Sequence, residues 1–554
     1  MAGSILLENN YGYHWYSRDD ISVRGYVLHD GQPFRDGELV SLLSGVESFE
    51  AFKAFLDSSD GCFSILIRRK GRIYAAVDRA RSMPIYFTND GSLISDSLKA
   101  IAEERGLGRN DLDPSAMEEL LKSAYLCHER TVYKCCSQLN EGQLAEFSEG
   151  HIRREYYYVH KAPVREISRQ EALDLFEKTS EEAFSELLSV IGERPIVISL
   201  SGGYDSRYVA CMLKKMGAKD VSCYSYGLDD SFEIAEARHI AQVLGYRWKS
   251  VEYTNKLVRD CFDRDKVAYY DIITGMDSDA YMQNYAAVKL LHEEGWFKPG
   301  SVFITGLCND MPTGYYLNDA QTAADFTPDV ESVAEHVVQK RNFHRWLGER
   351  SLSDYRALVR RTAEEMGLSV TDYQSYVSAC DAVVTVTEHS RLNLHMNDVH
   401  AFFGYEWLIP CWSRKLLDFW YSMPVSLRVN QNLYEEFIIS RVPAQYGLGT
   451  KKQVIAYTLY SGLDRFKARL RLLTKRLVCM PLGLPLREED DFNNFNMFIA
   501  ILYRRISQKK LLGFRNLSVD LVFILYMMEQ WFGRDFYNTL IKEYNESGHR
   551  ADQN

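Results

Sequence analysis

Short apolar runs recur through the middle of the chain, and they predict the strands of a buried parallel sheet. The clearest run, PIVISL at 195–200, is rich in β-branched residues and ends in a turn of small residues. A helical pattern follows at 208–216, and Gly217 is its predicted end. Further strand-like runs occupy 221–227 and the stretch that begins at Val302. Strands that alternate with helices in this way predict an α/β domain with a doubly wound parallel sheet.

Two other helices are predicted in the same half of the chain. The first extends from about Ser168 to Val190, because Ser168 and Glu171 have the spacing of a capping box. The second, Glu233 to Leu244, has apolar residues along one face. The stretch at 158–170, just ahead of the first helix, is predicted to be a linker.

Before residue 160 the pattern changes to short strands separated by turns. Apolar runs at 63–67 and 73–77 flank the polar stretch 68–72, which predicts a β-hairpin. Further along, 93–101 passes from a strand pattern into a helix pattern. The first part of the chain is therefore predicted to be a separate, strand-rich domain.

Composition narrows the class of protein. A chain of 554 residues is long enough for two or three domains, and a net charge of −11 argues against a nucleic-acid groove as the main surface. The eleven cysteines are scattered and form no C-x-x-C pair, so free thiols in a reducing cytoplasm are expected. No signal peptide is predicted, and the apolar stretch at 521–528 is too short to span a bilayer.

The turn after the clearest strand has the features of an anion-binding loop. Its sequence, SGGYDS at 201–206, places two glycines without Cβ atoms where a backbone must approach a phosphate closely. The following helix would add its positive end, and the two serines would add hydroxyl donors. Asp205 is placed to orient the loop or a Mg²⁺ ion. No Walker motif, G-x-x-x-x-G-K-[ST], occurs here.

This loop resembles the pyrophosphate loop of the N-type ATP pyrophosphatases, which cut ATP between its α and β phosphates. Four motifs ahead of it resemble the glutaminase half of asparagine synthetases: D-G-x-F at 60–63, D-R-x-x-x-x-P-x-Y at 78–86, S-x-S-L-K-A at 95–100, and L-x-x-G at 139–142 followed by a Tyr-Tyr pair. The resemblance covers about residues 20–455. It implies an α/β/β/α sandwich of the Ntn type at 1–160 and a pyrophosphatase-type synthetase domain at 170–455. Beyond 455 the resemblance fades, and residues 456–554 are predicted to be a helical extension.

The N-terminal half departs from the family at its nucleophile. Family members that hydrolyse glutamine use an N-terminal cysteine, whereas this chain begins Met-Ala-Gly-Ser and has its first cysteine at Cys62, inside a strand-like segment. The stretch 36–38 is at best a remnant of the glutamine loop. The half is therefore expected to be a structural relic that does not hydrolyse glutamine, as in β-lactam synthetase.

The resemblance also implies which residues bind ATP. In the family the adenine ring lies along the ends of the first two strands, and a lysine near 451 contacts the phosphates. The residues expected to bind ATP are Ser199, Leu200, Ser201, Gly202, Gly203, Asp205, Ser206, Ser225, Tyr226, Gly227, Thr305, Gly306 and Lys451, with Lys452 as the second choice for the lysine.

The loop at 305–316 is expected to supply the second carboxylate. Asp310 matches the aspartate that helps hold Mg²⁺ in the family, and two carboxylates facing a polyphosphate suit a hard cation. Asp205 and Asp310 are thus the predicted metal ligands. Leu307 stands where the family has its glutamate or tyrosine base, so either the attacking amine needs no base from this site or another residue supplies it. Glu388 and Glu406 are the candidates, with the alternative that each belongs to a buried ion pair.

Basic and apolar residues alternate at 463–476, which predicts a basic amphipathic helix. Such a helix could bind a protein partner or a membrane surface, or pack on the synthetase half.

Together these features predict an ATP-dependent ligase of the asparagine-synthetase type. It would adenylate a substrate carboxylate, release pyrophosphate, and pass the acyl group to ammonia or another amine. Three acids stay open: one that carries its own amine, as in β-lactam synthetases and lasso-peptide cyclases; a sugar carboxylate in surface-polysaccharide synthesis; and aspartate, which Leu307 and the Asp-x-Pro at 310–312 disfavour. The remaining alternative is a nucleotide-binding scaffold that has lost its chemistry.

Overall fold

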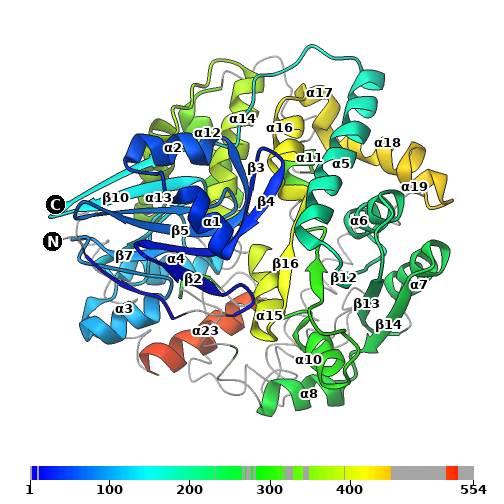
Figure 1. The fold of residues 1–554 in the computed structure, drawn as a ribbon, viewed down its shortest axis with the longest axis horizontal. Helices are drawn as coiled ribbons and strands as arrows, with labels where there is room; N and C mark the ends of the chain where they lie inside the picture. The colour runs from blue at the N-terminus through cyan, green and yellow to red at the C-terminus, as the bar shows by residue number, and fades with distance from the viewer. Residues whose placement is uncertain are drawn as a thin grey trace.

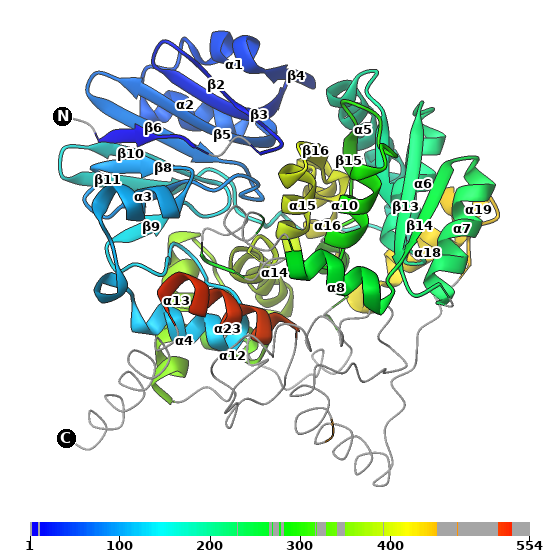
Figure 2. The ribbon, with the colours of Figure 1, turned by 90° about the horizontal axis from the view of Figure 1, so that it is seen from below.

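In the part of the chain that it describes, the computed structural model contains three β-sheets, two in the N-terminal half and one in the remainder (Figures 1 and 2). It describes residues 3–8, 11–229, 231–264, 269, 276–278, 282–307, 309–315, 317, 328–340, 349–391, 393–450, 474 and 519–533. In Figure 2 the N-terminal sheets, in blue and cyan, lie on one side of the molecule and the parallel sheet, in green, on the other.

The larger N-terminal sheet has seven antiparallel strands in the order β11-β10-β6-β5-β3-β2, with β4 also paired to β3. Its strands are β2 (Trp15–Arg18), β3 (Ile21–His29), β4 (Gln32–Arg35), β5 (Ser59–Arg69), β6 (Arg72–Val77), β10 (Gln143–Ser148) and β11 (His151–Tyr156). The predicted hairpin is confirmed: β5 and β6 are joined by Lys70 and Gly71, both with positive φ, at 50° and 76°. This is the backbone of a two-residue turn that matches the twist of its strands.

The smaller N-terminal sheet packs on one face of the larger one. It has the order β1-β8-β7-β9, with β1 (Ser4–Leu6), β7 (Tyr86–Thr88), β8 (Leu93–Ser95) and β9 (Cys136–Gln138). Leu66, Ile73, Phe87, Ile94 and Phe147 are among the buried residues that fill the space between the two sheets.

Helices cover the two outer faces of this pair of sheets. On the larger sheet lie α1 (Asp36–Leu43) and α2 (Phe49–Asp57), whose buried faces join the apolar core of β3 and β5. On the smaller sheet α3 (Leu98–Arg105) contacts β7 and β8. The layers therefore follow the predicted α/β/β/α order.

The third sheet is wholly parallel, in the order β14-β13-β12-β15-β16. Its strands are β12 (Ile196–Ser199), β13 (Val221–Gly227), β14 (Arg247–Glu252), β15 (Val302–Ile304) and β16 (Glu406–Leu408). The chain leaves the central strand β12 first toward β13 and β14, then crosses to β15 and β16 on the other side. Such a reversal opens a crevice at the carboxyl ends of the central strands.

Helices flank this parallel sheet, and the doubly wound fold is as predicted. The capping box is present: Ser168 caps α5 (Arg169–Ile191), and Glu171 returns a bond to the cap. The other described helices are α4 (Pro114–Ser123), α6 (Tyr204–Lys215), α7 (Phe232–Leu244), α8 (Asn255–Arg264), α10 (Tyr285–Glu293), α11 (Asp310–Thr313), α12 (Val330–Lys340), α13 (Glu349–Glu365), α14 (Tyr373–Val384), α15 (Met396–Phe402), α16 (Arg414–Tyr421), α17 (Val425–Arg428), α18 (Asn432–Ser440), α19 (Val442–Gln445) and α23 (Val519–Phe532).

The predicted start of α6 is wrong by one turn. The helix begins at Tyr204, directly after an extended Gly203, and not at Tyr208. Its first turn carries the polar residues Asp205 and Ser206, which hide the apolar period on which the prediction relied. The helix N-terminus therefore lies within the loop itself.

The stretch predicted as a linker is ordered and bridges the two halves. The Tyr158 hydroxyl donates to Asp418 Oδ1 at 3.0 Å, and His160 Nε2 donates to the backbone oxygen of Arg79 at 3.0 Å. The backbone N–H of Arg165 donates to the oxygen of Ser422 at 2.8 Å. These bonds fix the path of the chain from one half to the other.

Four fully buried charges meet where the two halves touch. Arg81 Nη2 lies 2.7 Å from Asp277 Oδ2, and Arg391 lies 3.7 Å from the same oxygen and 3.4 Å from Glu141 Oε1. Burial opposes ionisation of Asp277, but the neighbouring cations, Arg81 foremost, hold its pKa below the usual value. The two arginines and the two carboxylates balance in charge, and Gln138 and Asn140 bond to the same guanidinium groups, so the junction is a buried polar network.

At the C-terminal end, α23 contains the apolar run 521–528 and contacts α4 (Figure 2). The predicted basic helix at 463–476 lies outside the described residues, apart from Thr474. Among the described helices, none combines the length and apolarity needed to cross a membrane.

Replacing Asp277 with Asn should strongly destabilise the protein. The change would leave Arg81 and Arg391 buried without their shared anion, a loss of about 3–5 kcal/mol. Thermal and urea unfolding midpoints would measure it. The matched control is Asp220→Asn, because Asp220 pairs with Lys298 at 2.6 Å on the surface and should contribute less than about 1 kcal/mol. Equal midpoints for the two variants would contradict the role given to the cluster.

Acid should destabilise the protein through its buried histidines. Burial lowers the pKa of His128 to about 4, and that of His160 and His400 to about 3. Because the unfolded chain binds these protons near pH 6.5, the stability is complete above that pH and falls below it. Each histidine contributes at most about 1.4 kcal/mol per pH unit.

The variant His160→Asn, which keeps a donor for the oxygen of Arg79, should make the melting temperature less dependent on pH between 6.5 and 4.5. The exposed His151 provides the control variant His151→Asn, whose profile should follow the unaltered protein. A His160→Asn profile as steep as that of the unaltered protein would count against this origin of the acid sensitivity.

Candidate active site

A cavity of about 280 Å³ lies at the carboxyl ends of β12, β13 and β15. This is the edge at which parallel α/β sheets bind ligands. Its walls come mainly from the last residues of β12 and β13, from the loops after β12 and β15, and from the first turns of α6 and α7. The lining residues are Ser199, Leu200, Ser201, Asp205, Ser206, Ser225, Tyr226, Glu233, Ile234, Gln283, Thr305, Gly306, Leu307, Asp310 and Met396.

The loop at 201–206 is held in shape by its own serines. Ser206 Oγ accepts from the backbone N–H of Ser201 at 3.0 Å and lies 3.0 Å from Ser201 Oγ, which accepts from the N–H of Gly203 at 3.2 Å. A Cβ at Gly202 would lie 3.2 Å from the Glu236 side chain, so this position is crowded. These hydrogen bonds fix the backbone of the loop at the N-terminus of α6, close to α7.

Arg207 fastens this loop to two other segments. The guanidinium is buried and donates to the backbone oxygen of Gly202, to Glu236 Oε1, and to the backbone oxygens of Leu448 and Thr450. Thr450 is the last described residue before the predicted lysine. One side chain therefore ties together the anion loop, α7 and the stretch that leads to Lys451.

The two predicted metal ligands line the same cavity from different loops. Asp205 Oδ1 accepts from Asn309 Nδ2 at 3.1 Å, so the neighbour of Asp310 bonds directly to the first loop. The loops also touch at Gly306, where a Cβ would lie 2.8 Å from the carbonyl carbon of Asp205. Oxygen ligands in this arrangement fit a hard divalent cation such as Mg²⁺. Within the described parts of the chain, no group of three or more His, Cys, Asp or Glu forms a metal centre by itself.

The start of α18 reaches both aspartates. The Tyr434 hydroxyl donates to Asp205 Oδ1 at 2.8 Å, and Gln431 Nε2 lies 3.5 Å from Asp310 Oδ1 and 2.6 Å from Thr313 Oγ1. Asn430 and Gln431 both have left-handed backbones, with φ of 54° and 58°. For residues with a Cβ this conformation costs about 1–2 kcal/mol each, which marks a backbone fixed by its surroundings.

Most of the residues predicted to bind the nucleotide line this one cavity. Those that do are Ser199, Leu200, Ser201, Asp205, Ser206, Ser225, Tyr226, Thr305 and Gly306, together with Asp310 and Leu307. Gly202, Gly203 and Gly227 belong to the same loops but are not part of the lining. Lys451 and Lys452 lie outside the described residues.

The structure does not support Glu406 as the missing base. Glu406 begins β16, where it pairs with Val302 at the amino end of β15, so it lies at the edge of the sheet opposite the cavity. There its carboxylate is bound by Arg35 at 2.6 Å and by Arg194. Since Arg35 belongs to the N-terminal half, Glu406 is a member of an ion-pair network between the halves, the alternative named from the sequence.

Glu388 is not part of the cavity lining either. It lies in the helical turn Thr385–His389 that extends α14, and it is 9% exposed. The cavity does contain a third carboxylate that the sequence analysis missed, Glu233, at the second position of α7. The sequence did contain a signal for Glu233, because a helix that starts soon after the carboxyl end of a central strand brings its first residues to the edge of the sheet where ligands bind. Tyr434 and Gln431 had no such signal, because only tertiary packing brings them near.

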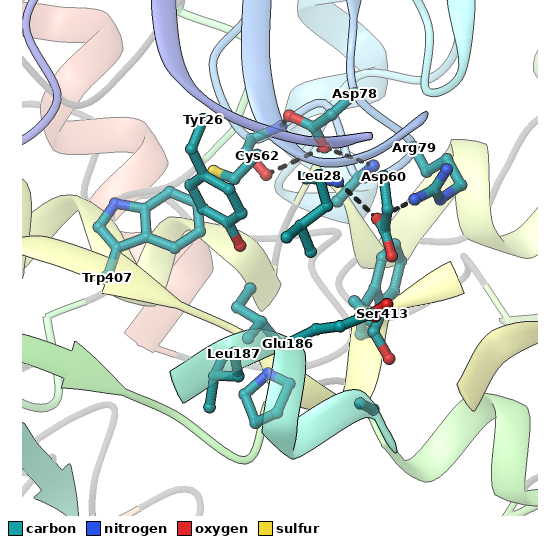
Figure 3. Close-up of a pocket in the computed structure, with 17 residues that line it drawn as sticks. Tyr26, Leu28, Asp60, Cys62, Asp78, Arg79, Glu186, Leu187, Trp407 and Ser413 are labelled. Carbon is teal, nitrogen blue, oxygen red and sulfur yellow. Dashed lines mark hydrogen bonds and ion pairs between the residues drawn. The ribbon is translucent and has the colours of Figure 1, made fainter. Parts of the chain in front are cut away.

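The glutaminase-like half has a separate, small cavity of about 40 Å³ against α5 and β16 (Figure 3). Cys62 lies in its wall, and burial, with the Asp78 charge next, raises the pKa of its thiol well above the usual value. Burial also raises the pKa of Asp78 to about 6. A buried thiol kept protonated in mid-strand is not an activated nucleophile.

Comparisons with known proteins agree with this organisation. The model of the asparagine synthase family matches residues 181–454, and that of the glutamine amidotransferase domain matches residues 42–158.

Two solved structures can be compared with the chain. The NH3-dependent NAD synthetase of Campylobacter jejuni is 15% identical, over 36% of this chain and 96% of its own, with a TM-score of 0.21. The glutamine phosphoribosylpyrophosphate amidotransferase of B. subtilis is 12% identical, over 43% and 72%, with a TM-score of 0.18. The assignment of the fold follows from the strand orders given above and not from these two structures.

No curated protein matches the chain. The two domain matches follow each other in the same order as the antiparallel double sheet and the parallel sheet with its cavity. The chain therefore belongs to the asparagine synthase family, with a glutamine amidotransferase domain ahead of its synthase domain.

Proposed function

We propose that this protein is an ATP-dependent ligase that adenylates a carboxylate and transfers the acyl group to an amine without hydrolysing glutamine itself. The observation that carries the proposal is the single cavity shared by the 201–206 loop, the α6 N-terminus and the carboxylates of Asp205 and Asp310. A site that joins anion-binding amides to two carboxylates suits a triphosphate with its divalent cation.

In the first step a carboxylate oxygen of the substrate attacks the α-phosphorus of ATP. The bond to the bridging oxygen breaks, pyrophosphate leaves with the electron pair, and an acyl-adenylate remains. The loop amides and the positive end of α6 face the charge that builds up on the leaving pyrophosphate. Bound Mg²⁺ would neutralise part of the phosphate charge, with Asp205 and Asp310 as its protein ligands.

In the second step an amine attacks the acyl carbon, AMP leaves with the electron pair, and one proton passes from the nitrogen to a base. Leu307 cannot accept that proton, although it lines the cavity. The described carboxylates in the cavity wall are Asp205, Asp310 and Glu233. Because Glu233 is the one not assigned to the metal, we assign it the part of proton acceptor.

The amine is proposed to be ammonia, or an amine carried by the substrate. Burial keeps the Cys62 thiol protonated, so this thiol is not an activated nucleophile for glutamine hydrolysis. Among the three classes of acid, the apolar Leu307 in the cavity wall favours a peptide or natural-product acid that closes a ring or forms an amide. Lys451 is proposed to contact the phosphates, because Arg207 fixes Thr450 beside the loop.

Exchange of radioactive pyrophosphate into ATP, dependent on a carboxylic acid, tests the first step. Aspartate, uronic acids, and peptide or β-amino acids should be compared, and one class should support exchange. Asp205→Asn should lower the rate about 100-fold or more, the usual loss when a charge-stabilising group is removed. The surface variant Asp220→Asn is the control. Binding of ATP without exchange for any acid would favour a nucleotide-binding scaffold.

Amide formation with ammonium and with glutamine tests the source of the amine. With an acid that supports exchange but carries no amine of its own, ammonium chloride should give product and glutamine should not. Cys62→Ala should not alter either result, because the buried thiol takes no part. Glutamate release from glutamine that disappears in Cys62→Ala would contradict the proposal and restore a working glutaminase.

A further inference from the structure

Both aspartates of the proposed site are bonded to one short stretch of the chain. The 428–435 segment runs from the last residue of α17 into the first turn of α18. Neither α17 nor α18 supplies a residue to the cavity lining. The segment therefore acts from behind the two loops that carry Asp205 and Asp310.

Tyr434 is the contact to the first loop. Its side chain is fully buried, with ring centroids 6.0 Å from Tyr208, 6.1 Å from Trp420 and 6.3 Å from Phe176. Only the hydroxyl has a polar role, as donor to Asp205 Oδ1 at 2.8 Å. A rigid ring with a single donor aimed at a carboxylate restricts that carboxylate to one rotamer.

Gln431 and Arg428 are the contacts to the second loop. Gln431 bonds to Thr313 Oγ1 at 2.6 Å and approaches Asp310 Oδ1 at 3.5 Å, which spans the first and last residues of α11. The buried Arg428 donates to the backbone oxygen of Pro312 at 2.8 Å and pairs with Asp381 at 2.7 Å. A Cβ at Gly314 would lie 2.3 Å from the oxygen of Arg428, so the two backbones are in close contact.

We propose that the 428–435 segment is a positioning element that sets the relative placement of Asp205 and Asp310, through Tyr434 and Gln431. This inference rests on the proposed function and deepens it. Two carboxylates on separate loops must keep a fixed separation if they are to share one divalent cation, and contacts from a third segment can set that separation. The segment supplies that distance from outside the cavity.

One further observation supports the assignment. The left-handed backbones of Asn430 and Gln431 bring the Gln431 side chain onto α11, and such conformations persist where the surroundings require them.

The experiment is a titration of Mg²⁺ at a fixed ATP concentration, with the rise in melting temperature as the readout. Tyr434→Phe removes one oxygen and leaves the ring packed. It should raise the Mg²⁺ concentration for half-maximal stabilisation about tenfold, the factor expected for one hydrogen bond to a charged group. The melting temperature without ligands should change far less than the Mg²⁺ dependence.

Tyr208→Phe is the matched control, because Tyr208 is equally buried, neighbours Tyr434, and donates to Ser180 Oγ at 2.7 Å on α5. Its Mg²⁺ dependence should equal that of the unaltered protein. Gln431→Asn, which tolerates the left-handed backbone but shortens the side chain, is a second test that does not depend on the fold of Tyr434→Phe. It should also raise the Mg²⁺ requirement.

The variant Asp205→Asn distinguishes a failure of the positioning role from a failure of the proposed metal site. If Asp205→Asn raises the Mg²⁺ requirement but Tyr434→Phe and Gln431→Asn do not, the positioning role is overturned and the proposed site stands. If Asp205→Asn leaves the Mg²⁺ dependence unchanged, the metal role of Asp205 is overturned, and the positioning role with it. An equal shift in Tyr208→Phe would also overturn the inference, since the effect would then follow from any loss of a buried hydroxyl.

Discussion

Two guanidinium groups are buried where the halves of the chain meet, and their need for buried counter-charges constrains how the two halves pack together. Arg81 comes from the N-terminal half and Arg391 from the synthase half, and both face Asp277. An uncompensated charge in this position would be strongly destabilising, and the partners Asp277 of Arg81 and Glu141 of Arg391 come from the opposite half. These ion pairs therefore help to hold the two halves together.

The site depends on a different principle, the direction of the strands. In a parallel sheet all carboxyl ends lie at one edge, so the ends of β12, β13 and β15 meet there although they are far apart in the sequence. The same rule places Glu406 at the opposite edge, with Arg35 and Arg194. Strand direction therefore places the cavity residues at one edge of the sheet and the ion pairs of Glu406, which join the two halves, at the other.

The sequence predicted those features that local rules determine. The β5–β6 hairpin, the capping box of α5 and the residues around the 201–206 loop each follow from a short pattern, and the structure contains them. The start of α6 was misplaced because polar residues fill its first turn. For Glu406 the sequence left a base and an ion-pair member open, because its edge of the sheet depends on register, and Tyr434 was missed because an apolar environment conceals a single polar contact.

The left-handed backbones of Asn430 and Gln431 also limit which residues evolution can place at these two positions. Residues branched at Cβ are excluded there by their backbone sterics, whereas Gly, Asn and Asp are admitted. In related chains that keep the same turn, position 430 should be limited to Gly, Asn and Asp. The residues on the outer face of α18 should vary much more. A restricted position of this kind would mark the turn in an alignment even where the residues it serves have changed.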